Sequence, residues 1–235
     1  MTPSRLRFVV GEAIRRHALW APGARVVVAV SGGLDSVCLL DLLVVTAGWH
    51  GGALEVATCD HGTRAGQADE ADFVCAEAAR HGLRAHRFAL ALGAGASEAT
   101  CRDARYAALR SVGADRIAVA HHRGDLAETV LINLMRGTGP RGVGGMVWRS
   151  SDVVRPLLGV DRAQLEAWAR HRGLEWREDP TNRDPAHLRN RVRHEVLPLL
   201  EAIRPGATRA IGRSAARLAA EQAPKRAIEP DSDAS

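Results

Sequence analysis

The sequence predicts an α/β fold, a Rossmann-like parallel sheet flanked by helices, with a short helical C-terminal extension. Three observations support this prediction. Short β-branched or apolar runs alternate with segments of helical periodicity, a pattern typical of parallel βαβ units. A turn that contains two glycines joins the first such run to the first helical segment. The chain has 235 residues, enough for one α/β domain with a full core and a small appendage.

The individual elements follow from apolar periodicity. Runs expected to form strands lie at residues 25–30, 54–58, 84–88 and 116–120, with a further candidate at 148–155. Helical spacing of apolar residues marks 36–47, 67–81, 98–112, 125–136, 161–171 and 188–203. We expect a main domain over residues 1–156, a basic and mostly helical extension over 157–221 that packs on it, and a disordered tail over 222–235.

Charge is distributed unevenly along the chain, whose net charge is +5. Residues 1–135 hold 14 Arg and 14 acidic residues, whereas residues 136–217 hold 16 Arg and 9 acidic residues. An Arg-rich half indicates a phosphate-rich partner such as nucleic acid. Nearly all basic residues are Arg, a bias that genome composition also produces, so charge alone leaves the partner open.

Composition argues against several other classes of protein. Hydrophobic residues make up 46% of the chain, and no apolar stretch approaches the length of a membrane span. The first residues lack a signal-peptide core, so we expect a soluble, cytoplasmic protein without membrane contact. The cysteines are widely spaced and suggest buried thiols, with neither a disulfide framework nor a zinc site; they are Cys38, Cys59, Cys75 and Cys101.

The segment Ser-Gly-Gly-Leu-Asp-Ser, residues 31–36, lies where the first predicted strand turns into the first helix. Its glycines can take conformations closed to other residues and let a ligand approach the backbone. The turn and the helix N-terminus direct unpaired N–H groups to one place, which favours a phosphate, and both serines add hydroxyl donors. Asp35 would repel phosphate unless Mg2+ bridges the two. A simple turn with capping serines is the structural alternative.

This segment resembles the SGGxDS signature of the PP-loop ATP pyrophosphatases, which cleave ATP between its α- and β-phosphates and adenylate a carbonyl-type oxygen. The resemblance implies an adenine nucleotide alpha hydrolase-like fold, a nucleotide-binding role for residues 1–156, and ATP and Mg2+ as cofactors. The residues that it assigns to ATP are Ser31, Gly32, Gly33, Leu34, Asp35 and Ser36.

Further segments resemble the tRNA(Ile)-lysidine synthetase family, in the order in which that family carries them. They are CDHGTRAGQ from residue 59, CRDARYAAL from 101, HHRGDLAET from 121, RGTGPRGVGGM from 136 and EDPTNRDPAHLRNRVR from 178. The resemblance implies a ligase that adenylates O2 of the wobble cytidine in tRNA(Ile) with a CAU anticodon. L-lysine then attacks C2, and lysidine forms. The sequence leaves the oligomeric state open and allows a homodimer.

The resemblance also implies roles for single residues. Catalytic roles are expected for Asp35, Asp125, Arg102 and Arg105, with Asp35 and Asp125 as Mg2+ ligands. Contacts to tRNA or lysine are expected from His121, His122, Glu128, Arg136, Arg189, Asn190 and Arg193. Each group has a structural alternative, since an acidic helix start complements the helix dipole and arginines can form a solvated helix face. The polar cluster with Asn182 and Asp184 has a turn as its alternative, and Trp148, Trp168 and Trp176 are expected in the core.

The chain departs from the family pattern in the segment HHRGDLAET, residues 121–129. Gly124 and Leu126 stand where the family carries the first Asp and the Gln, whereas Asp125, the second carboxylate, remains. If Asp125 is the carboxylate that binds Mg2+ or the incoming lysine in place of both, Asp125→Asn should reduce lysidine formation more than Glu128→Gln does. Restoring the family residues at 124 and 126 should maintain or raise activity. The chain is also shorter than many members, which continue into further tRNA-binding domains.

Two other functions stay open at this point. One is 2-thiolation of tRNA by a PP-loop enzyme, although sulfur transfer normally uses paired cysteines or a cluster, which the cysteine spacing does not favour. The other is a tRNA-binding relative that lost catalysis together with the first Asp and the Gln of the family segment.

Overall fold

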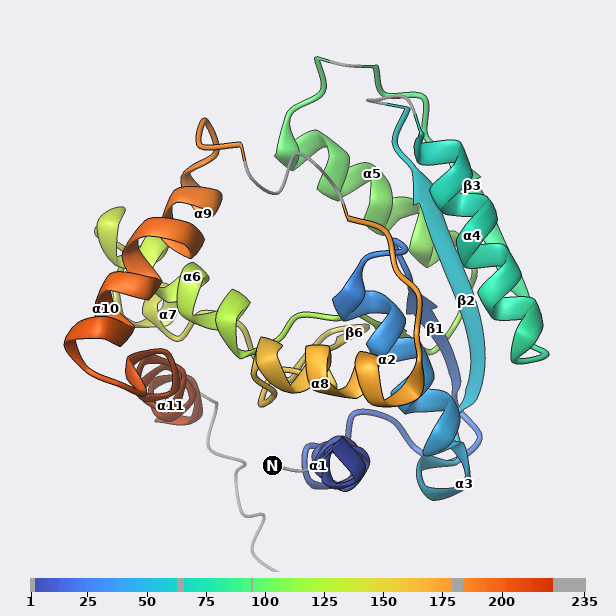
Figure 1. Cartoon of the computed structure of the whole chain (residues 1–235), viewed down its shortest axis with the longest axis horizontal. Helices are drawn as coiled ribbons and strands as arrows, with labels where there is room; N and C mark the ends of the chain where they lie inside the picture. Colours follow the sequence, from blue (N-terminus) through green and yellow to red (C-terminus); the bar gives the residue numbers. More distant parts are fainter. Residues whose placement is uncertain (1–2, 63–65, 94, 179–183, 222–235) are drawn as a thin grey trace, which may run out of the picture.

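The computed structural model describes residues 3–62, 66–93, 95–178 and 184–221. Within them, six strands form one sheet in the order β3-β2-β1-β4-β6-β5, parallel except for β5. The strands are β1 Arg25–Ala29, β2 Ala53–Asp60, β3 Ala85–Ala89, β4 Arg116–Ala118, β5 Arg149–Ser150 and β6 Val153–Val154. The predicted α/β fold with a parallel sheet is therefore confirmed (Figure 1).

The four principal strands form within a few residues of the predicted runs, but residues 148–155 differ from the expectation of one strand. They fold into a short hairpin of β5 and β6, in which Arg149 pairs with Val154 and Ser150 with Val153. The chain reverses at Ser151, whose φ is 54°. A polar Ser-Ser-Asp stretch inside the apolar run favours this turn, and β6 then joins the sheet beside β4.

Helices flank the sheet and were largely predicted in place. They are α1 Pro3–Arg16, α2 Leu34–Val45, α3 Ala47–His50, α4 Gln67–Arg80, α5 Glu98–Ser111, α6 Arg123–Met135, α7 Pro140–Val143, α8 Arg162–Arg172, α9 Leu188–Arg191, α10 Leu197–Ile203 and α11 Ala207–Glu221. The individual predicted segments did not include α1, α3, α7 or α11, although the extension that holds α11 was expected to be mostly helical. The expected helix over 188–203 is interrupted by a π-helical turn, Val192–Val196, because Pro198 has no N–H to donate to the preceding turn.

The core lies on both faces of the sheet, and β1 shows how. Val26 and Val28 point into a large cluster with α1, α2, α4 and α8, whereas Val27 points into a second cluster with Tyr106 and Leu109 of α5. This alternation is the period of two of a strand that is covered on both faces. The arrangement places the carboxyl ends of the parallel strands, and the loops that follow them, at one edge.

The C-terminal extension packs on the rest of the chain in two ways. Trp168 of α8 is buried in the large cluster, against which Trp148 and Trp176 also pack, as expected for these tryptophans. On the other side, Ala215 of α11 packs with Leu126 of α6 in a smaller cluster. A domain boundary at 156/157 stays a prediction, and the expected tail over 222–235 lies outside the described residues. No helix among the described residues is long and apolar enough to cross a membrane.

Candidate active site

The loop between β1 and α2 is held by its own hydroxyl groups. Ser36 Oγ donates to the carbonyl oxygen of Gly33 at 2.8 Å and accepts from the backbone N–H of Ser31 at 3.2 Å. Gly32 has a φ of 85°, in the left-handed region that favours glycine. The two serines therefore shape the turn, and the first N–H groups of α2 have no partner inside the helix.

Two members of this segment serve the fold as well as the loop. Leu34 is buried in the large core cluster, so only its backbone can face a ligand. The carbonyl oxygen of Gly32 accepts from the backbone N–H of Arg177 at 2.9 Å. The segment that follows α8 is thus hydrogen-bonded to the loop. The side chain of the same residue contacts α4, because the Arg177 guanidinium lies 4.5 Å from the ring centre of Phe73.

Asp35 faces His122 across the edge of the sheet. Its Oδ2 lies 3.7 Å from His122 Nε2 and 3.4 Å from Arg162 Nη1 of α8. Its Oδ1 is buried and has no hydrogen-bond partner within the described part of the chain, and the same holds for His122 Nε2. Burial raises the pKa of Asp35, although His122 and Arg162 oppose this shift. A buried acceptor and a buried donor that both lack partners among the described residues make this place a candidate ligand site.

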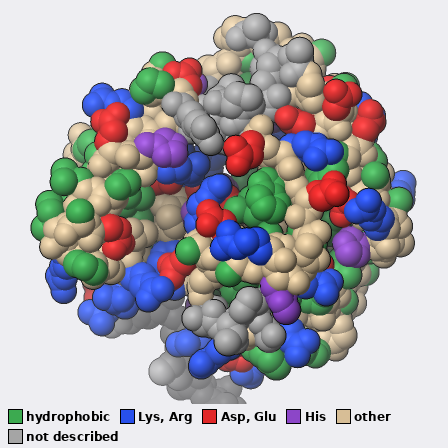
Figure 2. Space-filling model, viewed as in Figure 1, with side chains coloured by type: hydrophobic (Ala, Val, Ile, Leu, Met, Phe, Trp, Pro, Cys, Tyr) green, Lys and Arg blue, Asp and Glu red, His purple; other side chains and the backbone are tan. Residues whose placement is uncertain are grey.

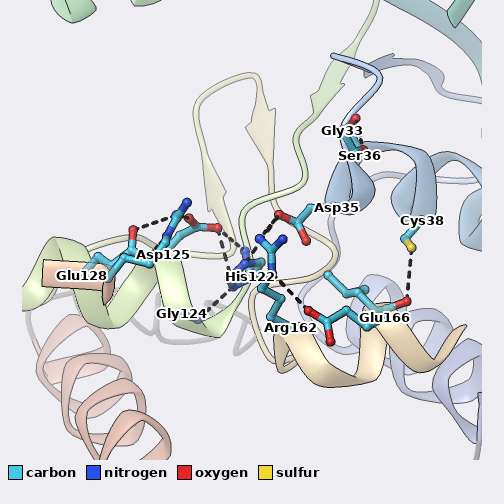
Figure 3. A network of polar contacts seen from close by, with 12 residues as sticks. Gly33, Asp35, Ser36, Cys38, His122, Gly124, Asp125, Glu128, Arg162 and Glu166 are labelled. Carbon is cyan, nitrogen blue, oxygen red and sulfur yellow. Dashed lines mark hydrogen bonds and ion pairs between the residues drawn. The ribbon is translucent and has the colours of Figure 1, made fainter. Parts of the chain in front are cut away.

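His122 begins α6 and caps it (Figure 3). Its Nδ1 accepts from the backbone N–H of Gly124 at 2.9 Å, while its own backbone N–H donates to Asp125 Oδ2 at 2.9 Å. This reciprocal arrangement is a capping box. Since Nδ1 accepts, Nε2 of the neutral ring carries the proton and points toward Asp35. The helix-capping alternative for Asp125 is thus realised.

Asp125 and Glu128 form a buried ion-pair cluster with two arginines from the C-terminal extension. Arg193 donates to Glu128 Oε1 at 2.6 Å and to Asp125 Oδ1 at 2.9 Å, and Arg189 donates to Glu128 Oε2 at 2.8 Å. Burial alone would raise the pKa of Asp125, but His122, the neighbouring His121 and Arg189 outweigh it and hold that pKa at about 2. Both arginines, expected at tRNA or lysine, point at carboxylates.

Sequence reasoning missed Arg162 and Arg155. Arg162 is the first residue of α8, where the helix dipole disfavours a cation. This unfavourable placement is the sequence signal that could have identified Arg162 as a site residue. Arg155 follows β6 and donates to His121 Nδ1 at 3.3 Å. Burial lowers the pKa of His121 to about 3, so this ring is neutral around pH 7.

The remaining predicted residues lie at different places. Arg102 and Arg105 of α5 lie over the Tyr106 ring, at 5.8 and 5.5 Å from its centre, and Arg105 is close enough to contribute to the lowered pKa of His121. Arg136 ends α6, about 20 Å along the helix from His122. Asn190 donates to the carbonyl oxygen of Asp184 at 2.9 Å and so fixes the loop before α9. Asn182 lies outside the described residues.

A cavity of about 300 Å³ lies beside α9, and a larger one of about 530 Å³ lies between α6, α8 and the α10–α11 connection. The larger cavity is lined by charged groups of both signs, among them Glu128, Asp161, Arg162, Arg193 and Glu201. In the space-filling view, basic and acidic side chains also gather at a hollow between α6 and α2 (Figure 2). The site can therefore hold ligands that carry both charges.

Comparison with known proteins places this geometry in a family. The PP-loop domain model matches residues 10–200. The chain is 43% identical over 190 residues to the tRNA(Ile)-lysidine synthase of Solibacter usitatus, covering 78% of this chain and 42% of the relative. It is 41% identical over 218 residues to that of Thermobifida fusca, covering 89% of this chain and 67% of the relative. The chain belongs to the tRNA(Ile)-lysidine synthase family of PP-loop proteins.

Membership confirms the resemblance that the sequence motifs carry. The fold agrees too: the U34-tRNA thiolase NcsA of Methanococcus maripaludis, solved with its [4Fe-4S] cluster, superposes with a TM-score of 0.75 at 19% identity, covering 92% of this chain and 79% of that one. At this identity the likeness shows the fold alone. The chain spans 42% and 67% of the length of the two curated family members.

Proposed function

We propose that this chain converts the wobble cytidine of CAU-anticodon tRNA(Ile) to lysidine, using ATP and L-lysine, in the cytoplasm. The observation that carries the proposal is Asp35, whose buried Oδ1 has no partner at the turn of a PP-loop, beside His122. Cytidine O2 becomes adenylated and pyrophosphate leaves, so the chemistry demands that negative charge be held in place.

ATP fits the loop of residues 31–36. Backbone N–H groups at the start of α2 suit the departing pyrophosphate, and Arg162 adds positive charge beside Asp35. Mg2+ fits Asp35, since this cation takes one or two carboxylates together with phosphates and water, and when bound it neutralises charge on the leaving group. Asp125 fits less well as a metal ligand, because both of its oxygens already accept from Arg193 and a backbone N–H.

Lysine fits the larger cavity. Free lysine carries an α-carboxylate and two ammonium groups, and the cavity offers carboxylates on Asp161 and Glu201 and the guanidinium group of Arg162. Asp125, with a pKa of about 2, is a weak proton acceptor. Both of its oxygens already accept hydrogen bonds, so we expect Asp125 to hold Arg193 and the start of α6 in place and not to act as a general base toward lysine.

The tRNA fits the edge that carries Arg102 and Arg105. An anticodon base must leave its stack to reach the loop, and guanidinium groups such as those of the exposed Arg102 and the half-buried Arg105 suit both phosphates and splayed bases. Among the described residues, neither side chain has a carboxylate partner, so both are available to RNA. A homodimer, which the sequence allows, is not required by this arrangement.

Thiolation is the second candidate, because the PP-loop fold also supports a thiolase. The properties of two of the four thiols, those of Cys38 and Cys59, argue against thiolation. Burial raises the pKa of Cys38 to about 12 and that of Cys59 to about 11, so neither supplies a thiolate near pH 7. The described part of the chain also holds no group of three or more His, Cys, Asp or Glu side chains that could bind a metal. A tRNA-binding relative without catalysis is the third candidate.

One experiment separates the three candidates. The purified chain is incubated with ATP, Mg2+, labelled lysine and a CAU-anticodon tRNA(Ile), and AMP release and label on the tRNA are followed together. Lysidine formation requires AMP and label in equal amounts, and a tRNA with a different anticodon serves as control. Sulfur incorporation with a sulfur donor would support thiolation, and tight tRNA binding without AMP would support the third candidate.

A further inference from the structure

Gly124 lies in the first turn of α6, and the structure gives it a specific environment. A Cβ at position 124 would lie 2.7 Å from Cε1 and 3.0 Å from Nδ1 of His122. Contacts below 3.0 Å essentially never occur for a real Cβ, so any side chain here would displace the imidazole. The backbone of Gly124 is helical and has no positive φ, so backbone conformation does not demand glycine.

The imidazole has little freedom to move aside. His122 is 3% exposed, its Nδ1 accepts from Gly124 N–H, and its Nε2 lies 3.7 Å from Asp35 Oδ2. A rotation that relieves the contact with a Cβ would break the capping hydrogen bond or turn Nε2 away from Asp35. Glycine is also among the least favourable residues in a helix, so its presence in the first turn of α6 needs a local reason.

We propose that Gly124 positions His122: the missing Cβ lets the imidazole lie against the first turn of α6 and direct Nε2–H toward Asp35. Gly124 touches no reacting atom in this account and acts through the ring alone. A Cβ of any side chain at this position is incompatible with the ring position in this chain. The catalytic consequence rests on the proposed function, whereas the ring position does not.

The first test reads the ring directly. Full-length protein labelled with 15N-histidine is compared by NMR with its Gly124→Ala variant, and the His122 signals are assigned with His122→Asn. The wild-type chain should show an unprotonated Nδ1 and a protonated Nε2, and Gly124→Ala should shift both signals. Gly48→Ala is the matched control, because a Cβ at Gly48 meets nothing within 4 Å, and it should leave the His122 signals unchanged.

The second test measures coupling. In a double-mutant cycle of thermal unfolding and AMP release, Gly124→Ala should be costly in the wild-type chain and nearly silent in His122→Asn, where the shorter cap makes room. Displacement of an aligned group by about 1 Å costs on the order of a hundredfold in rate, and this is the expected loss of AMP release. The double variant also keeps the test valid if Gly124→Ala alone fails to fold.

Two results would overturn the proposal: identical His122 signals in the wild type and Gly124→Ala, or equal costs of Gly124→Ala with and without the His122 ring. If the wild-type chain forms no lysidine but the signals shift as expected, the proposed function fails and the positioning role of Gly124 stands.

Discussion

Arg193 donates to Glu128 Oε1 at 2.6 Å and to Asp125 Oδ1 at 2.9 Å, and this bidentate grip joins the C-terminal extension to the first turns of α6. The exposed fraction of the Glu128 side chain is 1%, so this carboxylate is shielded from water. The arginine that the sequence assigns to a substrate thus neutralises the two carboxylates of the segment HHRGDLAET, residues 121–129. These ion pairs of Arg193 should first of all affect the stability of the fold.

Removing Arg193 should destabilise the fold. Arg193→Ala leaves Glu128 buried with one guanidinium fewer, and breaking a buried ion pair from one side typically costs about 3 kcal/mol. Urea unfolding measures the free energy of unfolding. Arg191→Ala is the matched control, because Arg191 pairs with Glu195 on the exposed side of the same segment, and it should change stability little. Equal losses in both variants would contradict the buried-pair account.

The salt dependence of tRNA binding should follow the arginines without carboxylate partners. Each phosphate contact adds to the slope of log Kd against log salt through counterion release. We expect Arg102→Ala with Arg105→Ala to flatten this slope, whereas changing Arg189 and Arg193 should leave it nearly unchanged. The sequence alone favoured the opposite for the second pair. Filter binding of tRNA from low to high salt measures the slope. A flattened slope after the change of Arg189 and Arg193 would show that these two arginines contact tRNA phosphates.

Asp35→Asn should separate function from stability. Burial raises the pKa of this carboxyl, so the charged form is held in the site at a cost, and the neutral amide should fold at least as well. AMP release should fall about a hundredfold or more, as for the loss of one electrostatic stabiliser. Thermal unfolding and an AMP assay at saturating Mg2+ measure both. Near-wild-type turnover would exclude a metal role for Asp35.

His121 should make the fold sensitive to acid. Its folded pKa is about 3, below the value near 6.5 in the unfolded chain. The unfolded state therefore binds the proton more readily, and stability is lost as pH falls below about 6.5 toward the folded pKa. The contribution is about 2 kcal/mol between pH 7 and pH 5. His121→Gln, which can still accept from Arg155, should flatten this part of the stability curve, and an unchanged curve would refute the assignment.

Restoring the family residues should harm this chain. Leu126 is 5% exposed and packs with Val130, Leu158 and Ala215, so Leu126→Gln buries an amide and costs about 1–3 kcal/mol. Gly124→Asp adds the collision with the His122 ring. The double variant should be less stable and less active, the reverse of the expectation from the sequence. Thermal unfolding with AMP release tests this, and a variant with higher activity would show that the site had degenerated.

The fold was predictable because each strand run and helical pattern agrees with its neighbours. Val26, Val27 and Val28 form one apolar run, as a strand covered on both faces requires, and the glycine turn after them signals the loop. The hairpin at 148–155 was not predictable in detail, because a two-residue strand carries almost no periodicity. The helix α1 was missed, although its apolar residues at 6, 10, 13 and 14 share one face.

The site was predictable as a set of residues but not as a set of contacts. Motif order places Asp35, His122 and Asp125 at one edge of the sheet, since loops after parallel strands meet there. Which arginine meets which carboxylate depends on how α9 and α8 pack, and no local pattern encodes that packing. Arg162, which the sequence did not single out, therefore lies beside Asp35 of the loop, whereas Arg193, expected at a substrate, pairs with Asp125 and Glu128. The reason for Gly124 became visible only with the position of the His122 ring.

The most direct test of the proposed function is the identity of the nucleoside at the wobble position. A CAU-anticodon tRNA(Ile) transcript is incubated with the chain, ATP, Mg2+ and lysine, digested, and analysed by mass spectrometry beside a reaction with Asp35→Asn. The account predicts lysidine in place of the wobble cytidine with the wild-type chain and unmodified cytidine with the variant. Unmodified cytidine with a folded, tRNA-binding wild-type chain would contradict it.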